Sequence, residues 1–141
     1  MQAEWVFVAL GSNLGDRSHH LAQGREALAT LSDTVLVAVT PVEETAPIGP
    51  SGQDSYLNQM ALLRTTLEPR ALLDRCLAIE RMQGRVRRVR WGPRTLDLDI
   101  VRFGARRVSE PGLTIPHPEL PNRDFWQREL VALLPYAQED E

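Results

Sequence analysis

Strand-like and helix-like segments alternate along this chain in an order that is compatible with few folds. In some segments the hydrophobic residues recur with the period of a helix, and in others they alternate or form short apolar runs, as in strands. The resulting order is strand, helix, strand, strand, helix, strand, followed by a shorter tail. We expect strands at Trp5–Leu10, Thr34–Thr40, Tyr56–Thr65 and Leu96–Phe103, a helix at Gly15–Leu31, and a second helix that begins at Pro69.

Local features support these elements. The run WVFVAL, from Trp5 to Leu10, is almost fully apolar and rich in β-branched and aromatic residues, as a central strand is. Pro69 suits the first turn of a helix, where its missing N–H has no partner to lose, and an apolar helix face follows it. The remaining expectations are a loop at Thr45–Asp54, a hairpin at Arg106–Thr114, a loop at Pro116–Asn122 and a helical stretch at Phe125–Leu134.

This order of elements is that of the ferredoxin-like fold, in which an antiparallel sheet carries helices on one face. We therefore predict an α+β protein with a ferredoxin-like βαββαβ arrangement. The chain has 141 residues, and no linker or change in composition divides it. A chain of this length is expected to form a single domain, spanning residues 1–141.

The basic residues exclude several kinds of chemistry. All sixteen of them are arginine, and the chain contains no lysine. A Walker A motif, which needs a lysine on the nucleotide phosphates, is therefore absent. Schiff-base catalysis by lysine is excluded for the same reason. If a side-chain cation holds phosphate in this protein, it has to be arginine or histidine.

The arginines are unevenly distributed. Six of them lie between Arg81 and Arg94, where no acidic residue occurs, whereas the rest of the chain has ten arginines against nineteen acidic residues. A nucleic-acid-binding domain is usually basic over a whole face or helix. A local anion site on an acidic protein fits this pattern better. The alternative is a solvated basic loop without a ligand.

The chain shows no sign of export or membrane insertion. No apolar run reaches the eighteen residues of a membrane span, and the first ten residues carry Glu4 but no basic residue, unlike a secretory signal. Cys76 is the only cysteine, so no internal disulfide can form. We therefore expect a cytoplasmic protein without a membrane partner.

Two carboxylates lie two residues apart in the last predicted strand. Residues i and i+2 of a strand project from the same face, so Asp97 and Asp99 face one side while Leu96, Leu98 and Ile100 face the other. Mg²⁺ prefers one or two carboxylates together with substrate phosphates and water. The alternative is a pair of solvated aspartates. The arginines that precede them favour the metal site, because carboxylates for Mg²⁺ beside guanidinium groups for phosphate are typical of phosphoryl transfer.

A longer motif contains these aspartates. The segment WGPRTLDLD, from Trp91 to Asp99, resembles the signature of the 6-hydroxymethyl-7,8-dihydropterin pyrophosphokinase family. The resemblance extends from about residue 5 to residue 135. It implies a ferredoxin-like fold and an enzyme that transfers pyrophosphate from ATP to the hydroxymethyl group of the dihydropterin, with release of AMP, in folate biosynthesis. The other segments that agree are GSNLG at Gly11–Gly15, YLN at Tyr56–Asn58, QGR at Gln83–Arg85, and PHP at Pro116–Pro118 with Arg123 and Phe125.

The resemblance also implies roles for individual residues. Asp97 and Asp99 would hold two Mg²⁺ ions, and the catalytic set would be completed by three arginines. The pterin would lie between two aromatic rings, with an asparagine at its edge. The three catalytic arginines are Arg85, Arg87 and Arg94; the ATP-binding residues are Glu80, Arg85, Arg87, Trp91, Arg94, Ile100, Thr114, His117 and Arg123; and the pterin-binding residues are Thr45, Ile48, Tyr56, Asn58, Asp97 and Phe125.

Two other hypotheses remain. The chain has Leu77 and Gly112 where family members can carry a glutamine and an arginine, which suggests a divergent paralogue that binds a pterin or nucleotide with altered or lost catalysis. The arginine-rich loop alone suggests an RNA binder, against which the acidic remainder of the chain argues. The expected partners are ATP and the dihydropterin, without nucleic acid, and the expected state is a monomer.

Overall fold

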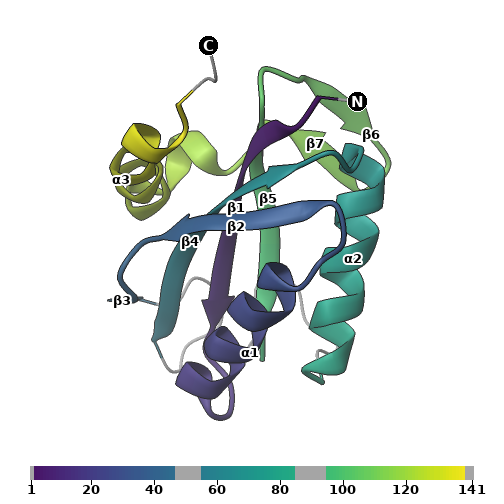
Figure 1. The fold of residues 1–141 in the computed structure, drawn as a ribbon. Helices are drawn as coiled ribbons and strands as arrows, with labels where there is room; N and C mark the ends of the chain where they lie inside the picture. The colour runs from purple at the N-terminus through teal and green to yellow at the C-terminus, as the bar shows by residue number, and fades with distance from the viewer. Residues whose placement is uncertain (1, 47–54, 85–94, 139–141) are drawn as a thin grey trace.

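A computed structural model describes residues 2–46, 55–84 and 95–138, which form a twisted sheet with helices packed on it (Figure 1). The six predicted core elements and the hairpin are all present. In chain order the elements are β1 (Glu4–Ser12), α1 (Arg17–Ala29), β2 (Thr34–Val39), β3 (Glu43–Thr45), β4 (Tyr56–Thr65), α2 (Pro69–Met82), β5 (Asp97–Phe103), β6 (Val108–Glu110), β7 (Leu113–Ile115) and α3 (Asp124–Leu133), with short 3₁₀ turns at Leu120–Asn122 and Leu134–Tyr136.

The main sheet has the strand order β2-β4-β1-β5, and each neighbouring pair is antiparallel. The two central strands, β1 and β4, are buried along most of their length, as their nearly continuous apolar sequences predict. β6 and β7 form a separate two-stranded sheet. The predicted α+β class is confirmed, and this order of strands is the one expected of the βαββαβ arrangement.

One strand differs from the sequence prediction. Thr45 was expected to begin a loop, but it ends the short strand β3, which pairs with β4 from Glu43 opposite Asn58 to Thr45 opposite Tyr56. Three residues are too few for a periodic pattern to be recognised in the sequence. The pairing with β4, which depends on residues more than ten positions away, is what makes this segment a strand.

Helices cover both faces of the sheet, not one face as the sequence predicts. α1 and α2 pack on the face that carries Val6, Val8 and Leu10, which gives the larger core. The opposite face carries Phe7 and Ala9, and it is covered by apolar residues of α3, among them Trp126, Leu130 and Leu133. The expectation failed because the basic βαββαβ unit has only two helices, and α3 belongs to the tail.

The helix ends are set by local chemistry. The side chain of Asp16 caps α1 by accepting a hydrogen bond from the backbone N–H of His19 at 3.1 Å, and Pro69 occupies the first turn of α2 as predicted.

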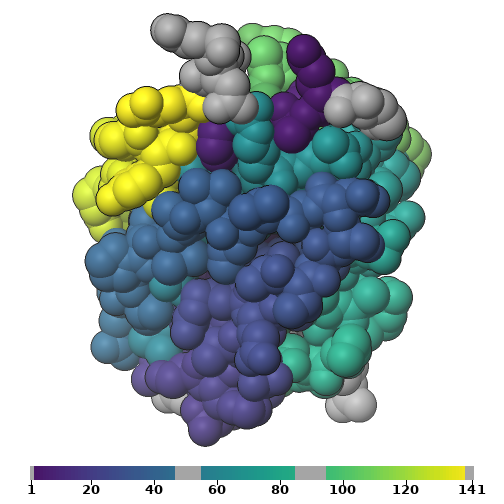
Figure 2. Space-filling model, viewed as in Figure 1, coloured from purple at the N-terminus to yellow at the C-terminus, as the bar shows by residue number. Residues whose placement is uncertain are grey.

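Side chains of α1, β2 and α2 fill much of the surface seen in Figure 2. Among the described residues, no helix is both long and apolar enough to cross a membrane.

Candidate active site

Three neighbouring strands bring Asn58, Gly11 and Asp97 into one row. Gly11 of β1 is paired with Asn58 of β4 on one side and with Asp97 of β5 on the other. Residues at the same register position share a face of the sheet, and this face is the one that carries α3. The next row on the same face runs from Met60 through Ala9 to Asp99. The central strand therefore places only small residues, Gly11 and Ala9, beside the two aspartates.

Gly11 leaves room for the groups that cross over the strand. A methyl group added at Gly11 would lie 3.4 Å from Oδ1 of Asn58 and 3.5 Å from Cδ1 of the Tyr56 ring. The space between the backbone of β1 and these two side chains is therefore just large enough for a methyl group in ordinary van der Waals contact. A larger side chain at this position would displace them.

The Asn58 amide is held in a fixed orientation. Its side chain is 6% exposed, and its Nδ2 donates a hydrogen bond to Oγ1 of Thr45 in β3. A buried amide with one group engaged can present its remaining polar atoms to a ligand in a defined direction. The structure therefore brings together three of the predicted pterin-binding residues, Thr45, Tyr56 and Asn58, around Gly11.

The two aspartates project from β5 as predicted. Both are half-buried and share the face of α3, while Leu98 and Ile100 are buried in the core on the face of α1 and α2. Leu98 lies between the two aspartates in the sequence. Its backbone N–H donates a hydrogen bond at 2.8 Å to the buried carboxylate of Glu80, near the end of α2. The contact of Glu80 fixes the strand that carries the aspartates, and ATP binding by Glu80 stays a prediction.

His117 lies beside Asp99. Its Nε2 is 3.6 Å from Oδ1 of Asp99, and its Nδ1 accepts a hydrogen bond from the backbone N–H of Glu119 at 3.1 Å. Since Nδ1 accepts, the ring proton is on Nε2 and points toward the aspartate. The backbone N–H of His117 also donates to the carbonyl of Val101 in β5 at 2.9 Å. Two contacts thus fix the ring relative to β5.

A tryptophan that the sequence analysis did not single out connects His117 with Arg123. The rings of His117 and Trp126 meet edge to face with their centres 4.9 Å apart, and the guanidinium carbon of Arg123 lies 4.4 Å from the centre of the Trp126 ring. Nε of Arg123 is buried without a hydrogen-bond partner among the described residues. Arg123 is therefore stacked rather than paired with a carboxylate in this part of the chain, and its charge is available to an anion.

The other predicted site residues are more dispersed. Phe125 is half-buried, with its ring centre 6.4 Å from that of Trp126. Thr114 is exposed on β7, and the side chain of Ile100 is 5% exposed in the core on the face away from the aspartates. Five of the predicted site residues lie outside the described residues: Ile48, Arg85, Arg87, Trp91 and Arg94.

The donor set around β5 fits magnesium when substrate oxygens complete it. Within residues 2–46, 55–84 and 95–138, no group of three or more histidine, cysteine, aspartate or glutamate side chains is arranged to hold a metal ion. Mg²⁺ does not need such a group, because it is usually bound by one or two carboxylates together with substrate phosphates and water. Asp97 and Asp99 supply two carboxylates on one face of a fixed strand.

The comparisons with known proteins point to one family. The model of the 7,8-dihydro-6-hydroxymethylpterin-pyrophosphokinase family matches residues 7–135. A relative from Pseudomonas aeruginosa is 45% identical over 130 residues, which are 92% of this chain and 80% of the relative. A relative from Haemophilus influenzae is 44% identical over 120 residues, which are 85% of this chain and 75% of the relative. A relative from Bacillus subtilis is 43% identical over 123 residues, which are 85% of this chain and 72% of the relative. All three are named 2-amino-4-hydroxy-6-hydroxymethyldihydropteridine pyrophosphokinase.

Proposed function

The chain belongs to the 7,8-dihydro-6-hydroxymethylpterin pyrophosphokinase family, and we propose that the row formed by Asn58, Gly11 and Asp97 is the centre of its active site. The chain is a pyrophosphokinase that transfers pyrophosphate from ATP to the hydroxymethyl group of the dihydropterin in folate biosynthesis. The proposal assigns the two substrates to the two ends of this row.

The pterin is assigned to the end formed by β3 and β4. Tyr56 offers an aromatic face for a flat bicyclic ring, and Phe125 is proposed as the second face, since rings gain from offset or edge contacts with other rings. Asn58 and Thr45 supply a fixed pair of polar groups for the pterin edge. A buried polar edge has to be matched by such groups, because an unmatched one costs about 1–3 kcal/mol.

The ATP phosphates are assigned to the end formed by β5 and the segment between β7 and α3. On that side Arg123 presents a guanidinium group whose buried Nε has no hydrogen-bond partner among the described residues, and His117 presents an N–H. The proposed contacts of the nucleotide also include three arginines and four other residues: Arg85, Arg87, Arg94, Trp91, Glu80, Ile100 and Thr114. The three arginines of this set and Arg123 are the residues that would balance the charge of a triphosphate, since the chain has no lysine.

Magnesium is proposed as the metal, with two ions held by Asp97 and Asp99. When bound, magnesium ions neutralise phosphate charge and lower the pKa of a coordinated hydroxyl group. The protein's own part is to fix the two carboxylates on β5, to orient the pterin hydroxymethyl group toward the phosphates, and to direct the Nε2–H of His117 to that side. Holding two reactants in line in this way accounts for much of phosphoryl-transfer catalysis.

The observation that carries the site assignment is the shared register of Asn58, Gly11 and Asp97, because it puts an amide proposed for the pterin edge and a carboxylate proposed for the metal on one sheet face. An Asp97→Asn variant tests it. We expect a loss of AMP formation from ATP and the dihydropterin of about 10³-fold or more, with thermal unfolding unchanged within a few degrees. Asp74→Asn, on the exposed face of α2, is the matched control and should retain full activity. Full activity in Asp97→Asn would overturn the assignment.

We also propose that the chain acts as a cytoplasmic monomer with one domain over residues 1–141. The sheet has helices on both faces, and each face carries its own apolar core among the described residues. Sedimentation equilibrium at micromolar concentration measures the oligomeric state directly.

A further inference from the structure

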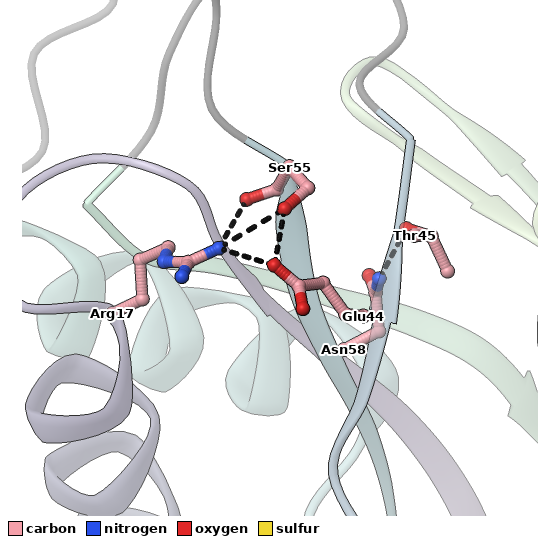
Figure 3. A network of polar contacts seen from close by, with 5 residues as sticks. All are labelled: Arg17, Glu44, Thr45, Ser55 and Asn58. Carbon is pink, nitrogen blue, oxygen red and sulfur yellow. Dashed lines mark hydrogen bonds and ion pairs between the residues drawn. The ribbon is translucent and has the colours of Figure 1, made fainter.

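Arg17, the first residue of α1, makes a cluster of polar contacts with two residues that are distant in sequence (Figure 3). Its Nη1 donates to the backbone carbonyl of Ser55 at 2.8 Å, to Oγ of Ser55 at 3.3 Å and to Oε2 of Glu44 at 3.2 Å. The hydroxyl of Ser55 donates in turn to the same oxygen of Glu44. Arg17, Glu44 and Ser55 therefore form a closed triangle, which we call the Arg17 triangle.

Each partner of Arg17 is a direct neighbour of a residue assigned to the pterin. Glu44 precedes Thr45 in β3, and Ser55 precedes Tyr56 at the start of β4. Glu44 is the middle residue of β3 and Ser55 directly precedes β4, so both partners flank the pairing of Thr45 with Tyr56. A shift of either backbone would move the adjacent pterin-binding side chain.

β3 is held from both of its faces (Figure 3). Successive side chains of a strand point to opposite faces, so Glu44 points to the face of α1 while Thr45 points to the face of Asn58. On the first face Glu44 is bound by Arg17, and on the second Thr45 accepts the hydrogen bond of Asn58. A strand of only three residues has few ladder hydrogen bonds of its own, so these side-chain contacts are important for its position.

We propose that Arg17 is a positioning residue of the pterin subsite: it fixes Glu44 and the carbonyl of Ser55 and thereby sets the spacing between Thr45, Tyr56 and Asn58. This inference rests on the proposed function, because it concerns the substrate assigned to that end of the row. Arg17 touches no substrate in this scheme. It acts through the backbone of β3 and the start of β4.

The geometry suits arginine for a specific reason. The contact to the Ser55 carbonyl is shorter than the one to the Glu44 carboxylate, and the side chain of Glu44 is 58% exposed whereas that of Arg17 is 29% exposed. An exposed ion pair contributes little energy by itself. The main effect of Arg17 is therefore the directed bond to a backbone carbonyl, which fixes position, rather than the neutralisation of Glu44.

The test compares Arg17→Met with Arg17→Lys and with a remote control. Methionine keeps the apolar part of the side chain and removes every donor, whereas lysine keeps a charged donor. The control is Arg70→Met, because Nη2 of Arg70 likewise binds a carboxylate, that of Glu110 at 2.8 Å, and a backbone carbonyl, that of Pro111 at 3.0 Å, but in the β6–β7 hairpin and not in β3 or β4. Steady-state kinetics with each substrate varied in turn gives separate KM values and kcat.

For Arg17→Met we expect the KM for the dihydropterin to rise about five- to thirty-fold, as the loss of one or two hydrogen bonds would give. The KM for Mg-ATP and the kcat at saturating pterin should change by less than about twofold. Arg17→Lys should reverse part of the rise in the pterin KM, and Arg70→Met should leave the pterin KM unchanged. Ser55→Ala and Glu44→Ala, which weaken the same triangle, serve if Arg17→Met does not fold, and they should shift the same constant in the same direction.

An unchanged pterin KM in Arg17→Met, or an equal rise of both KM values, would overturn this inference while leaving the pyrophosphokinase assignment intact. The failure of the proposed function looks different. In that case the unmodified protein itself forms no AMP from ATP and the dihydropterin.

Discussion

Nε2 of His117 lies 3.6 Å from Oδ1 of Asp99, while Nδ1 of the same ring accepts a hydrogen bond from the backbone N–H of Glu119. The histidine therefore presents an N–H, and not a lone pair, to the side of β5 on which the carboxylates lie. A donor in this position is suited to bind a phosphate oxygen that approaches Asp99, and it is unsuited to remove a proton from a substrate hydroxyl.

This orientation predicts the effect of His117→Leu. The change removes the donor and the edge-to-face contact with Trp126. The KM for Mg-ATP is expected to rise about tenfold or more, as the loss of a hydrogen bond to a charged group gives, with a much smaller change in the pterin KM. Steady-state kinetics measures both values, and His19→Leu, on the exposed side of α1, is the control. A larger effect on the pterin KM than on the ATP KM would contradict the assignment.

Gly11 gives a prediction that depends on side-chain size. An alanine methyl group at this position would meet Asn58 and Tyr56 at ordinary contact distances, so Gly11→Ala should change the pterin KM by no more than a few-fold. Gly11→Val adds two methyl groups against the same side chains, and overpacking of this kind typically costs about 1–3 kcal/mol. We expect its pterin KM to rise about tenfold or more. Equal KM values for the two variants would show that Tyr56 and Asn58 do not need their present positions.

The buried hydrogen bond of Glu80 predicts a loss of stability together with a loss of activity. In Glu80→Leu the N–H of Leu98 loses its acceptor, and an unsatisfied buried donor costs about 1–3 kcal/mol. The strand segment that carries Asp97 and Asp99 should become less well ordered, so AMP formation is expected to fall as well. Urea unfolding gives the free energy, and hydrogen exchange at Leu98 reports on the local order. If stability falls while activity is unchanged, Glu80 does not affect the positions of the aspartates.

Glu129 gives a prediction about pH. Its side chain is buried in α3 at 3% exposure, and neither carboxylate oxygen has a hydrogen-bond partner among the described residues. Burial, with a smaller contribution from Glu43, raises the pKa of Glu129 to about 8 from 4.5. The folded protein therefore keeps this proton between these pH values, whereas the unfolded chain releases it.

It follows that the free energy of unfolding decreases as the pH rises from about 5 to about 8, by up to ~1.4 kcal/mol per pH unit from this group. The side chain introduced by Glu129→Gln cannot ionise, so this variant should lack that part of the slope. Its gain in free energy of unfolding over the unmodified protein should be largest at about pH 8. Glu26→Gln, on the exposed side of α1, should leave the slope unchanged. Urea unfolding at several pH values measures it. If Glu129→Gln and the unmodified protein have parallel pH dependences, Glu129 is ionised in the folded state.

The sequence was sufficient to predict the elements with a strong period and the pair of aspartates on one face. The bounds of β4 were predicted to the residue, and those of β2 to within one. Asp97 and Asp99 could be placed on one face because the alternation of a strand is a local property. What could not be predicted depends on contacts between distant segments.

Three examples show this limit. β3 exists because it pairs with β4, and the side of the sheet that α3 covers is decided by the packing of Trp126 and Leu130. The role of Arg17 depends on the approach of Ser55, which is 38 residues away in sequence. No pattern within either segment predicts the other. By contrast, a signal for Trp126 was present, since it is a second aromatic residue directly after Phe125 in an amphipathic helix.

The alternation of β5 has a consequence for how this site can vary. Asp97 and Asp99 face one side, while Leu98 and Ile100 anchor the strand in the core on the other. The separation of the Cα atoms of the two aspartates is thus set by the repeat of the backbone and not by the side chains around them. Replacing neighbours can alter affinity in small steps, but inserting or deleting a single residue between Asp97 and Ile100 would exchange the two faces and turn leucine toward the side proposed for the phosphates. Insertions and deletions within this strand should therefore be far less tolerated than substitutions beside it.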